Sequence, residues 1–408
     1  MSHMSADHDH AAPTRSDVVI MGGCGHVGLP LGIVMAQRGL NVTLYDINKA
    51  AVDIVNDSEL PFDEDGAASV LVDVIASGRL RATADPTVIR GADAVVVVVG
   101  TPIDEHLNPG LFAVPDAIEA VADELVDGQL LVLRSTVYPG VTALVEALAK
   151  RLGKDIDVVF CPERIAEGRA MTELTALPQI VAARSDRAFG RASELFKHLV
   201  DDIVRLEPEE AELAKLFTNS YRYIKFAIAN QFYVVANEYG IDFEKVRQAV
   251  IHDYPRAADL PGPGLAAGPC LFKDTMQLAA FNNNNFTLGH SAMLVNEGLP
   301  LYLVSRADDR WQLRDKTVGI LGMAFKAESE DIRSSLSYKL KRILRFRSAV
   351  VLTTDPYVAS DPDLVELDEV IERADVLFVG APHEVYRSLD PAQPTVDIWN
   401  IFNRGVVV

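Results

Sequence analysis

The stretch DVVIMGGCGHVGLPLGIVMAQRGLNVTLYD, residues 17–46, decides the fold of the first part of the chain. It begins with the apolar segment 17–21, passes through a GxGxxG pattern at residues 23–28 and continues into a helical pattern of apolar residues. A second apolar segment, 41–45, ends at Asp46. A strand, a glycine-rich turn, a helix and a second strand that ends in an acid are the parts of a βαβ unit that binds a dinucleotide.

Each glycine of this pattern has a physical reason. Gly23 allows the tight turn, Gly25 lets a pyrophosphate approach the backbone, and Gly28 lets helix and strand pack closely, while the helix N-terminus faces the phosphates. A carboxylate at Asp46 can accept hydrogen bonds from both ribose hydroxyls and repels a 2′-phosphate. The sequence therefore predicts a site for NAD rather than NADP. Cys24, inside the loop, is interpreted as a small filler rather than a reactive thiol.

The rest of the chain predicts an α/β protein with two Rossmann-like, doubly wound domains joined by a helical middle domain. Strand-like segments alternate with helix-length stretches up to about residue 206. Between 209 and 239, apolar residues recur at three- and four-residue steps, which predicts one long helix, and strand patterns return from 317. The expected divisions are a disordered tail at 1–16, a dinucleotide-binding domain at 17–206, a helical domain at 207–309 and an α/β domain at 310–408.

Composition and charge exclude several classes of function. The chain has 38 basic and 58 acidic residues, a net charge of −20, and such a field repels nucleic acid and anionic membranes. No apolar run reaches the roughly 18 residues of a membrane span. Three cysteines in 408 residues argue against a disulfide framework and favour the cytoplasm. An anionic small substrate would need a local basic pocket.

A second informative stretch contains a cysteine, a lysine and an aspartate within one helical turn. If Cys270 begins a helix, Lys273 and Asp274 project near the same face. A helix N-terminus and a lysine both stabilise a thiolate, and the aspartate offers a base. The alternative interpretation is a buried cysteine beside a surface lysine and aspartate.

The stretch PGPGLAAGPCLFKD, residues 261–274, resembles the catalytic loop of the UDP-glucose/GDP-mannose dehydrogenase family. Other motifs follow in the order typical of that family, and the similarity extends from about residue 17 to the C-terminus. These motifs are VGLPL at 27–31, GTP at 100–102, STVYPG at 135–140, PERIAEG at 162–168, ELAKLFTN at 212–219 and FKAESEDIR at 325–333.

The resemblance implies a four-electron oxidation of a primary alcohol to a carboxylate. Cys270 matches the nucleophile that captures the aldehyde as a thiohemiacetal, which a second NAD oxidises to a thioester. Lys215 would stabilise the developing alkoxide, with Asn219 one turn along the same helix. The residues matched to proton transfer are Asp274 and Thr136, through a bound water, and Glu167 as the base for thioester hydrolysis.

The resemblance also assigns binding residues, and it implies no metal. The predicted cofactor contacts are Gly23, Gly25, His26, Val27, Gly28, Asp46, Thr101, Thr136, Lys273 and Arg333. The predicted substrate contacts are Glu163, Arg164, Glu167, Lys215, Asn219, Arg256, Gly264 and Lys326. Arg256 would reach in from a neighbouring subunit, which implies a homodimer or a higher homo-oligomer. Lysines and arginines within the matched motifs would supply the positive charge that the acidic chain lacks as a whole.

The substrate implied by the resemblance is a UDP-sugar or GDP-sugar. The loop form AAGPCL at 266–271, preceded by DYPR at 253–256, resembles the branch that acts on UDP-N-acetylhexosamines such as N-acetylmannosamine or N-acetylglucosamine. UDP-glucose and GDP-mannose 6-dehydrogenases are the alternatives. A two-electron hydroxyacid or 6-phosphogluconate-type dehydrogenase would need no thiol. A non-enzymatic sensor of NAD or of a nucleotide sugar would not need Lys215 and Asn219 together with Cys270.

Overall fold

The computed structural model describes residues 16–101 and 110–408, so most of the expected tail and Pro102 of the GTP motif lie outside the described residues. Ser16, the last residue of the expected tail, is the first residue of strand β1. The chain forms two compact units, whose described parts are 16–101 with 110–215, and 216–408. The helical middle region and the C-terminal sheet thus belong to one unit.

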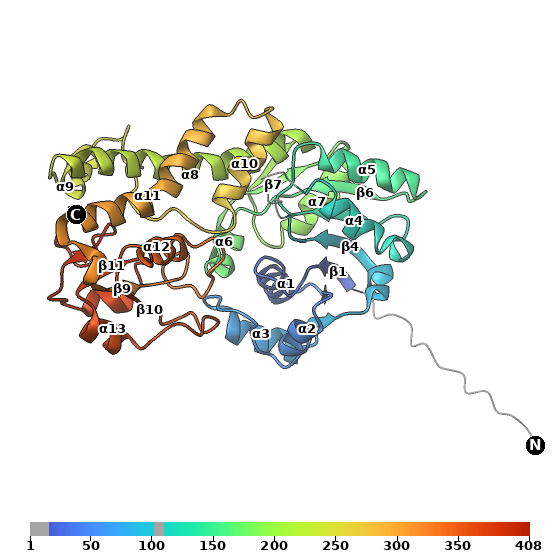
Figure 1. Ribbon diagram of the computed structural model, residues 1–408. Helices are drawn as coiled ribbons and strands as arrows, with labels where there is room; N and C mark the ends of the chain where they lie inside the picture. Colours follow the sequence, from blue (N-terminus) through green and yellow to red (C-terminus); the bar gives the residue numbers. More distant parts are fainter. Residues whose placement is uncertain (1–15, 102–109) are drawn as a thin grey trace, which may run out of the picture. The chain divides into compact units, whose positions relative to one another are not determined.

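The first unit contains an eight-stranded sheet in the order β3-β2-β1-β4-β5-β6-β7-β8. Figure 1 labels β1, β4, β6 and β7 of this sheet. All neighbouring strands are parallel except β6 and β7. The strands are β1 Ser16–Met21, β2 Val42–Tyr45, β3 Leu80–Thr83, β4 Ala92–Val97, β5 Leu130–Leu133, β6 Asp157–Phe160, β7 Gln179–Ala182 and β8 Ile203–Leu206. The order 3-2-1-4-5-6 is that of a doubly wound dinucleotide-binding fold.

Helices cover both faces of this sheet. The core on one face contains side chains of α1, α2, α3, α6 and α7, and the core on the other contains side chains of α4 and α5. The helices are α1 Gly28–Gln37, α2 Lys49–Asn56, α3 Ala67–Ala76, α4 Ala113–Glu119, α5 Val141–Arg151, α6 Ala170–Ala176 and α7 Asp186–Phe196. Strand β1 is buried on both faces, which explains its unbroken apolar sequence.

The second unit joins long helices to a four-stranded parallel sheet in the order β10-β9-β11-β12. Its helices are most of α8 Pro208–Glu238, with α9 Phe243–Ile251, α10 Leu271–Phe281, α11 Thr287–Trp311, α12 Leu336–Leu344 and α13 Leu367–Arg373. Its strands are β9 Thr317–Leu321, β10 Val350–Thr354, β11 Val376–Val379 and β12 Thr395–Val396. One core contains side chains from α8, α11, α12 and β9, so helices and sheet pack together.

The predicted α/β fold with two doubly wound sheets and a helical region is confirmed. Within residues 16–101 and 110–408, every helix falls short of the length or the apolar character that crossing a membrane would require.

Candidate active site

The glycine-rich loop after β1 leaves room for a ligand at one glycine only. A Cβ on Gly28 would lie 2.5 Å from the carbonyl oxygen of Gly22, so the chain's own packing excludes a side chain there. The nearest atom to a Cβ on Gly25 is 3.7 Å away, so Gly25 faces open space where a pyrophosphate can approach. The turn includes Gly23, where a Cβ would lie 2.7 Å from the carbonyl oxygen of Ile20, and the left-handed residue of the turn is Gly22, at φ +74°.

Asp46 lies beside this loop, at the end of β2. Its Oδ2 accepts the backbone N–H of Cys24 at 3.0 Å, and its Oδ1 accepts that of Asn48 at 3.0 Å. These bonds fix the carboxylate where a ribose would bind. Helix α1 begins beyond the loop with no side-chain cap and no acid in its first turn, which leaves its N-terminus to an anion. The site fits NAD.

Two of the three cysteines have unreactive thiols. Cys24 is 4% exposed, and burial together with the charge of Asp46 raises the pKa of its thiol to about 12. Burial likewise raises the pKa of Cys161 to about 12. Cys24 therefore has the filler role that its place in the loop suggested. The ring of His26, a predicted cofactor contact, lies against Phe62, with ring centroids 4.0 Å apart.

The loops that follow β4 and β5 are hydrogen-bonded to each other, next to β1, the strand that leads into the glycine-rich loop. Thr101 Oγ1 donates to the carbonyl oxygen of Thr136 at 2.6 Å. The hydroxyl of Ser135 accepts the N–H of Val99 at 2.8 Å. Two predicted cofactor contacts, Thr101 and Thr136, are thus in direct contact at the carboxyl edge of the sheet.

The loop after β6, residues 161–169, carries three predicted site residues. Glu163 pairs with Arg134, which is 2% exposed, and its Oε1 accepts the N–H groups of Arg164 and Ile165 at 2.6 and 2.9 Å. Arg164 donates to the carbonyl oxygen of Pro178. Glu163 and Arg164 therefore shape the loop, whatever else they contact.

Sequence reasoning missed Glu64, which anchors the same loop. Its Oε2 accepts the N–H of Gly168 at 3.0 Å, and its Oε1 accepts that of Ala170 at 2.7 Å. Glu64 is 5% exposed, and it holds the backbone on the C-terminal side of Glu167. No periodicity marks such a residue, because its partners lie more than 100 positions further along the chain.

Helix α8 carries Lys215 and Asn219 one turn apart, and both are buried. The start of this helix is fixed by Glu212, which is fully buried. Its carboxylate accepts the N–H of Gly140 at 2.6 Å and the N–H and hydroxyl of Thr142 at 2.8 and 2.6 Å. Glu212 thus caps α5 and fixes the turn of α8 that precedes Lys215.

In the second unit, Cys270 is the residue that directly precedes α10, and it is exposed. This is the predicted position, where the helix dipole stabilises a thiolate. Asp274, one turn on, is fully buried, with Asn219 Nδ2 donating to its Oδ2 at 2.5 Å and Lys273 Nζ 2.7 Å from its Oδ1. The structure therefore brings Asn219, Lys273 and Asp274 into one cluster beside the cysteine.

The loop before Cys270 is held by aromatic rings and by a buried amide. Gly264 exchanges two hydrogen bonds with the side chain of Asn230, at 2.9 and 3.0 Å. A Cβ on Gly264 would lie 2.2 Å from the ring of Trp399, and a Cβ on Gly268, at φ +100°, would lie 2.7 Å from the ring of Phe325. Both glycines of the matched pattern are required because rings of the second unit occupy the space of their side chains.

The remaining predicted contacts lie on two other segments. Arg333 binds the carboxylate of Asp331 with both its Nε and its Nη2, at 2.9 and 2.6 Å to Oδ2. Lys326 lies on the loop after β9, with its Nζ 5.5 Å from the centroid of the Phe325 ring. Arg256 is exposed, and its guanidinium lies 5.6 Å from the ring centroid of Tyr254.

Small-molecule sites are cavities of about 300–1,000 Å³, and the second unit has one of about 540 Å³ beside the loop that precedes Cys270. Gly268, Ser335 and Arg342 line it, together with Lys339, whose charge is paired with that of Glu297 in the same lining at 2.9 Å. Among residues 16–101 and 110–408, no three His, Cys, Asp or Glu side chains are grouped to hold a metal ion.

Three family models match successive parts of the chain, and all three describe the UDP-glucose/GDP-mannose dehydrogenase family. The NAD binding domain matches residues 17–200, the central domain 209–298 and the UDP binding domain 319–404.

Individual proteins are similar over most of their length. A UDP-N-acetyl-D-mannosamine dehydrogenase of Pyrococcus horikoshii is 30% identical over 381 residues, which cover 90% of each protein. A solved structure of a UDP-D-ManNAc dehydrogenase from the same organism has a TM-score of 0.85 at 28% identity and covers 91% of both chains. That of a UDP-glucose dehydrogenase from Pyrobaculum islandicum has a TM-score of 0.87 at 26% identity, with 97% of this chain and 95% of that chain covered.

Proposed function

Because the chain belongs to the UDP-glucose/GDP-mannose dehydrogenase family and is an NAD-dependent nucleotide-sugar dehydrogenase, we propose that it oxidises the C6 alcohol of a UDP-N-acetylhexosamine to the uronic acid. The observation that carries this proposal is the exposed Cys270 at the start of α10, beside the buried Asn219–Asp274–Lys273 cluster. Two-electron dehydrogenases have no use for such a thiol.

The proposed sugar rests on two observations. The AAGPCL form of the loop at 266–271 resembles the N-acetylhexosamine branch. The relative from P. horikoshii that covers 90% of the chain is named for UDP-N-acetyl-D-mannosamine. The UDP-glucose dehydrogenase of P. islandicum has a similar fold, so UDP-glucose is the alternative to be tested beside it.

The proposed reaction removes four electrons in two steps. The glycine-rich loop and Asp46 would hold NAD, which would supply the hydride acceptor for each oxidation. Asp274 and Thr136 relay the alcohol proton through water as the aldehyde forms, and the sulfur of Cys270 adds to the aldehyde carbon to give a thiohemiacetal. Loss of a second hydride and proton leaves a thioester. Water activated by Glu167 then breaks the C–S bond, which releases the carboxylate and returns the thiol.

Lys215 and Asn219 are proposed to stabilise the oxyanion in these steps. Donors fixed before the reaction stabilise a developing negative charge better than mobile water does. Both side chains are buried on one helix whose start is anchored by Glu212, so their positions are set before a substrate binds.

The test is stoichiometry with a panel of UDP-N-acetylmannosamine, UDP-N-acetylglucosamine, UDP-glucose and GDP-mannose. We expect two NADH per sugar acid with one of the UDP-N-acetylhexosamines. A Cys270→Ser variant should bind NAD and form no acid. One NADH per turnover with an aldehyde product, or full acid formation by the variant, would contradict the mechanism, and a preference for UDP-glucose would contradict the proposed sugar.

We also propose that the chain forms a homodimer through α8. Large apolar side chains recur along one side of this helix and are 42–57% exposed: Phe217, Tyr221, Ile228, Phe232 and Val235. A row of this length is typical of a helix whose partner is a second copy. A dimer would also let Arg256 contact the substrate of the neighbouring subunit. Light scattering should give a dimer for the native chain and a monomer for Phe232→Asp.

A reducing compartment is the proposed location. None of the three cysteines forms a disulfide, and the thiol proposed for catalysis is exposed. We therefore place the protein in the cytoplasm. Fractionation of cells should recover it with the cytosolic enzymes.

A further inference from the structure

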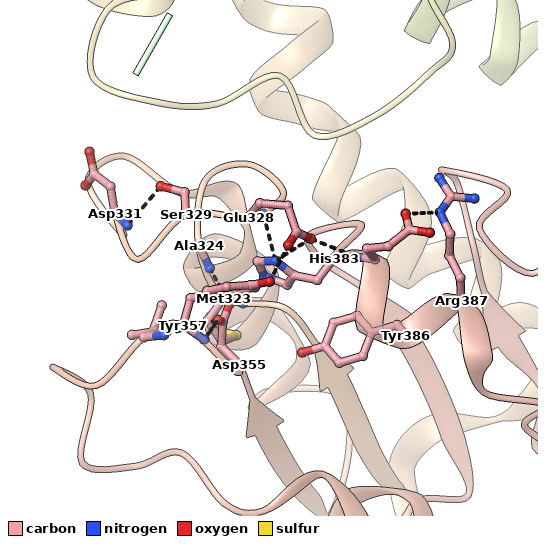
Figure 2. A network of polar contacts seen from close by, with 12 residues as sticks. Met323, Ala324, Glu328, Ser329, Asp331, Asp355, Tyr357, His383, Tyr386 and Arg387 are labelled. Atoms are coloured by element: carbon pink, nitrogen blue, oxygen red, sulfur yellow. Dashed lines mark hydrogen bonds and ion pairs between the residues drawn. The ribbon is translucent and has the colours of Figure 1, made fainter. Parts of the chain in front are cut away.

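Side chains from three successive loops meet at the carboxyl edge of the C-terminal sheet (Figure 2). Glu328 follows β9, Asp355 follows β10 and His383 follows β11. The chain leaves β9 toward β10 on one side and leaves β11 toward β12 on the other, so the strand order reverses between the neighbours β9 and β11. In open parallel sheets this is where ligands bind. Here the protein's own side chains fill the crevice.

Asp355 is the centre of the cluster, and its side chain is fully buried. Its Oδ2 accepts the N–H groups of Met323 and Ala324 at 2.6 and 2.9 Å and a bond of 3.0 Å from His383 Nε2. Its Oδ1 accepts the N–H of Tyr357 at 2.9 Å. Burial alone would raise the pKa of Asp355, but the bond to His383 and the backbone donors outweigh it and hold the pKa below its usual value.

The hydrogen bonds of His383 define its tautomer. The backbone N–H of Glu328 can only donate, and it points at Nδ1 of His383 from 3.0 Å, so Nδ1 is an acceptor and carries no proton. Nε2 therefore carries the proton and donates it to Asp355. The imidazole is fully buried, with the rings of Tyr357 and Tyr386 against it at centroid distances of 4.9 and 5.5 Å.

Glu328 is fixed through its side chain as well as its backbone. Its φ is +52°, an uncommon conformation for a residue with a side chain. Its Oε1 accepts the N–H of Glu384 at 2.7 Å, and its Oε2 accepts the hydroxyl of Tyr357. Figure 2 shows Glu328 beside His383, which follows β11, and Tyr357, which follows β10.

The loop after β9 is thus held at two points that flank Lys326. Asp355 binds the amides of Met323 and Ala324 before it, and His383 binds the amide of Glu328 after it. The arc between these points carries Lys326, a predicted substrate contact. The carboxylates of Asp355 and Glu328 would repel a diphosphate from the crevice itself. The side chains in the crevice therefore hold the loop and do not bind the nucleotide.

We propose that Asp355 and His383 are positioning residues, which fix the arc 324–328 so that Lys326 is held ready for the sugar nucleotide. The proposal rests on the proposed function for the role of Lys326, but the clamp itself does not depend on which substrate is used. The bond that His383 adds to the arc is the one from the amide of Glu328, beside the side-chain bonds of Glu328 to Tyr357 and Glu384.

Two substitutions of His383 separate its two bonds. Asparagine places an amide oxygen at the position of Nδ1, and it can still accept the N–H of Glu328. Glutamine reaches the position of Nε2, and it can still donate to Asp355 but leaves the N–H of Glu328 without its acceptor. Loss of one such bond corresponds to about a tenfold change in an equilibrium constant. His198→Gln, at an exposed position of the first unit, is the control.

The first readout is amide hydrogen exchange of peptides covering residues 323–328, measured without substrate. We expect faster exchange in His383→Gln, and exchange close to that of the native protein in His383→Asn and in the control. Equal exchange in all four proteins would overturn the clamp. If the native protein oxidises no sugar nucleotide, the proposed function fails while this result still decides the clamp.

The second readout is steady-state kinetics with the sugar nucleotide that the enzyme prefers. His383→Gln should raise the KM for the sugar nucleotide about tenfold, with kcat and the KM for NAD within about twofold of native, and His383→Asn should recover most of the loss. Equal effects on the KM for NAD and on kcat, or no recovery with asparagine, would show a general structural role and overturn positioning of Lys326.

Discussion

Replacement of Gly264 by alanine tests whether an aromatic ring fixes the catalytic loop. The new methyl group would lie 2.2 Å from Cζ3, 2.5 Å from Cη2 and 2.7 Å from Cε3 of Trp399. Carbon atoms in contact prefer about 3.5–4.0 Å, so the ring or the loop has to move by more than about 1 Å. All three atoms belong to one rigid ring, which cannot bend away as the end of a flexible side chain can.

Moving the ring and moving the loop would relieve the overlap at a similar cost in free energy. Overpacking a filled contact costs about 1–3 kcal/mol. Movement of the loop would instead strain its two hydrogen bonds to Asn230, each worth about 0.5–1.5 kcal/mol. Backbone strain adds nothing, because Gly264 is not among the residues with positive φ. We therefore expect Gly264→Ala to lose about 1–3 kcal/mol, which lowers kcat/KM about 5- to 150-fold if the loop displaces Cys270.

The assay compares kcat/KM and Tm for the native protein and four variants. Gly262→Ala is the matched control, because no atom lies within 4 Å of a Cβ built there, and it should behave as the native protein does. Trp399→Leu removes the ring, so the double variant Gly264→Ala/Trp399→Leu should lose less than the sum of the two single losses. Additive losses would show that the methyl group disturbs the substrate rather than the ring of Trp399. A Gly264→Ala variant as active as Gly262→Ala would refute the packing argument.

Four further predictions concern single residues. Glu64→Gln leaves one side-chain oxygen to accept from two backbone amides, so the loop would hold Glu167 less firmly and thioester hydrolysis should slow. Rapid mixing should then show an initial burst of two NADH per site, followed by a steady rate about tenfold below native; an unchanged steady rate would remove Glu64 from loop positioning. Asp46→Asn should raise the ratio of kcat/KM for NADP to that for NAD at least about tenfold, since the repelling charge is gone; a constant ratio contradicts the ribose role. Iodoacetamide at pH 8 should alkylate Cys270 and leave Cys24, with its pKa of about 12, unmodified by mass spectrometry; equal labelling would be the contrary result. Because folding lowers the pKa of Asp355, the ionised carboxylate stabilises the fold above about pH 4, and this stabilisation is lost as the pH falls through the lowered pKa. Asp355→Asn should therefore lower Tm at pH 7 and flatten the decline of Tm in acid; parallel curves of Tm against pH for the two proteins would contradict this role of Asp355.

The sequence was sufficient where the signal is local. The strand, glycine-rich loop, helix and acid of residues 17–46 are neighbours in the chain, and the structure confirms them as β1, α1 and β2 with Asp46 at the strand end. The position of Cys270 at the start of α10 was predicted on the same grounds. The pattern did not indicate that Gly22, just before it, is the residue of the turn with positive φ.

The parts that escaped prediction depend on partners far apart in the chain. Strands β3 and β8 are four residues each and partly exposed, and β7 is equally short and begins with a glutamine, so no periodic pattern marked them. Glu64 contacts a loop more than 100 residues away, and Trp399 contacts Gly264 across a longer interval. His383 and Asp355 carry no spacing signal at all, since strand order and not sequence brings them together.

The cations of the matched motifs differ in how much charge they can offer an anionic substrate. Lys273 lies 2.7 Å from the carboxylate of the buried Asp274, and Arg333 is paired with Asp331, so their charges are already balanced. Arg256 has no carboxylate within 4.0 Å in the part of the chain that the structure describes, and it rests on the ring of Tyr254. Charges at a surface act over only about 8–10 Å at physiological salt. In a chain of net charge −20, Arg256 can therefore stabilise a bound diphosphate only when its guanidinium contacts the diphosphate directly. A second subunit would bring the arginine into that contact.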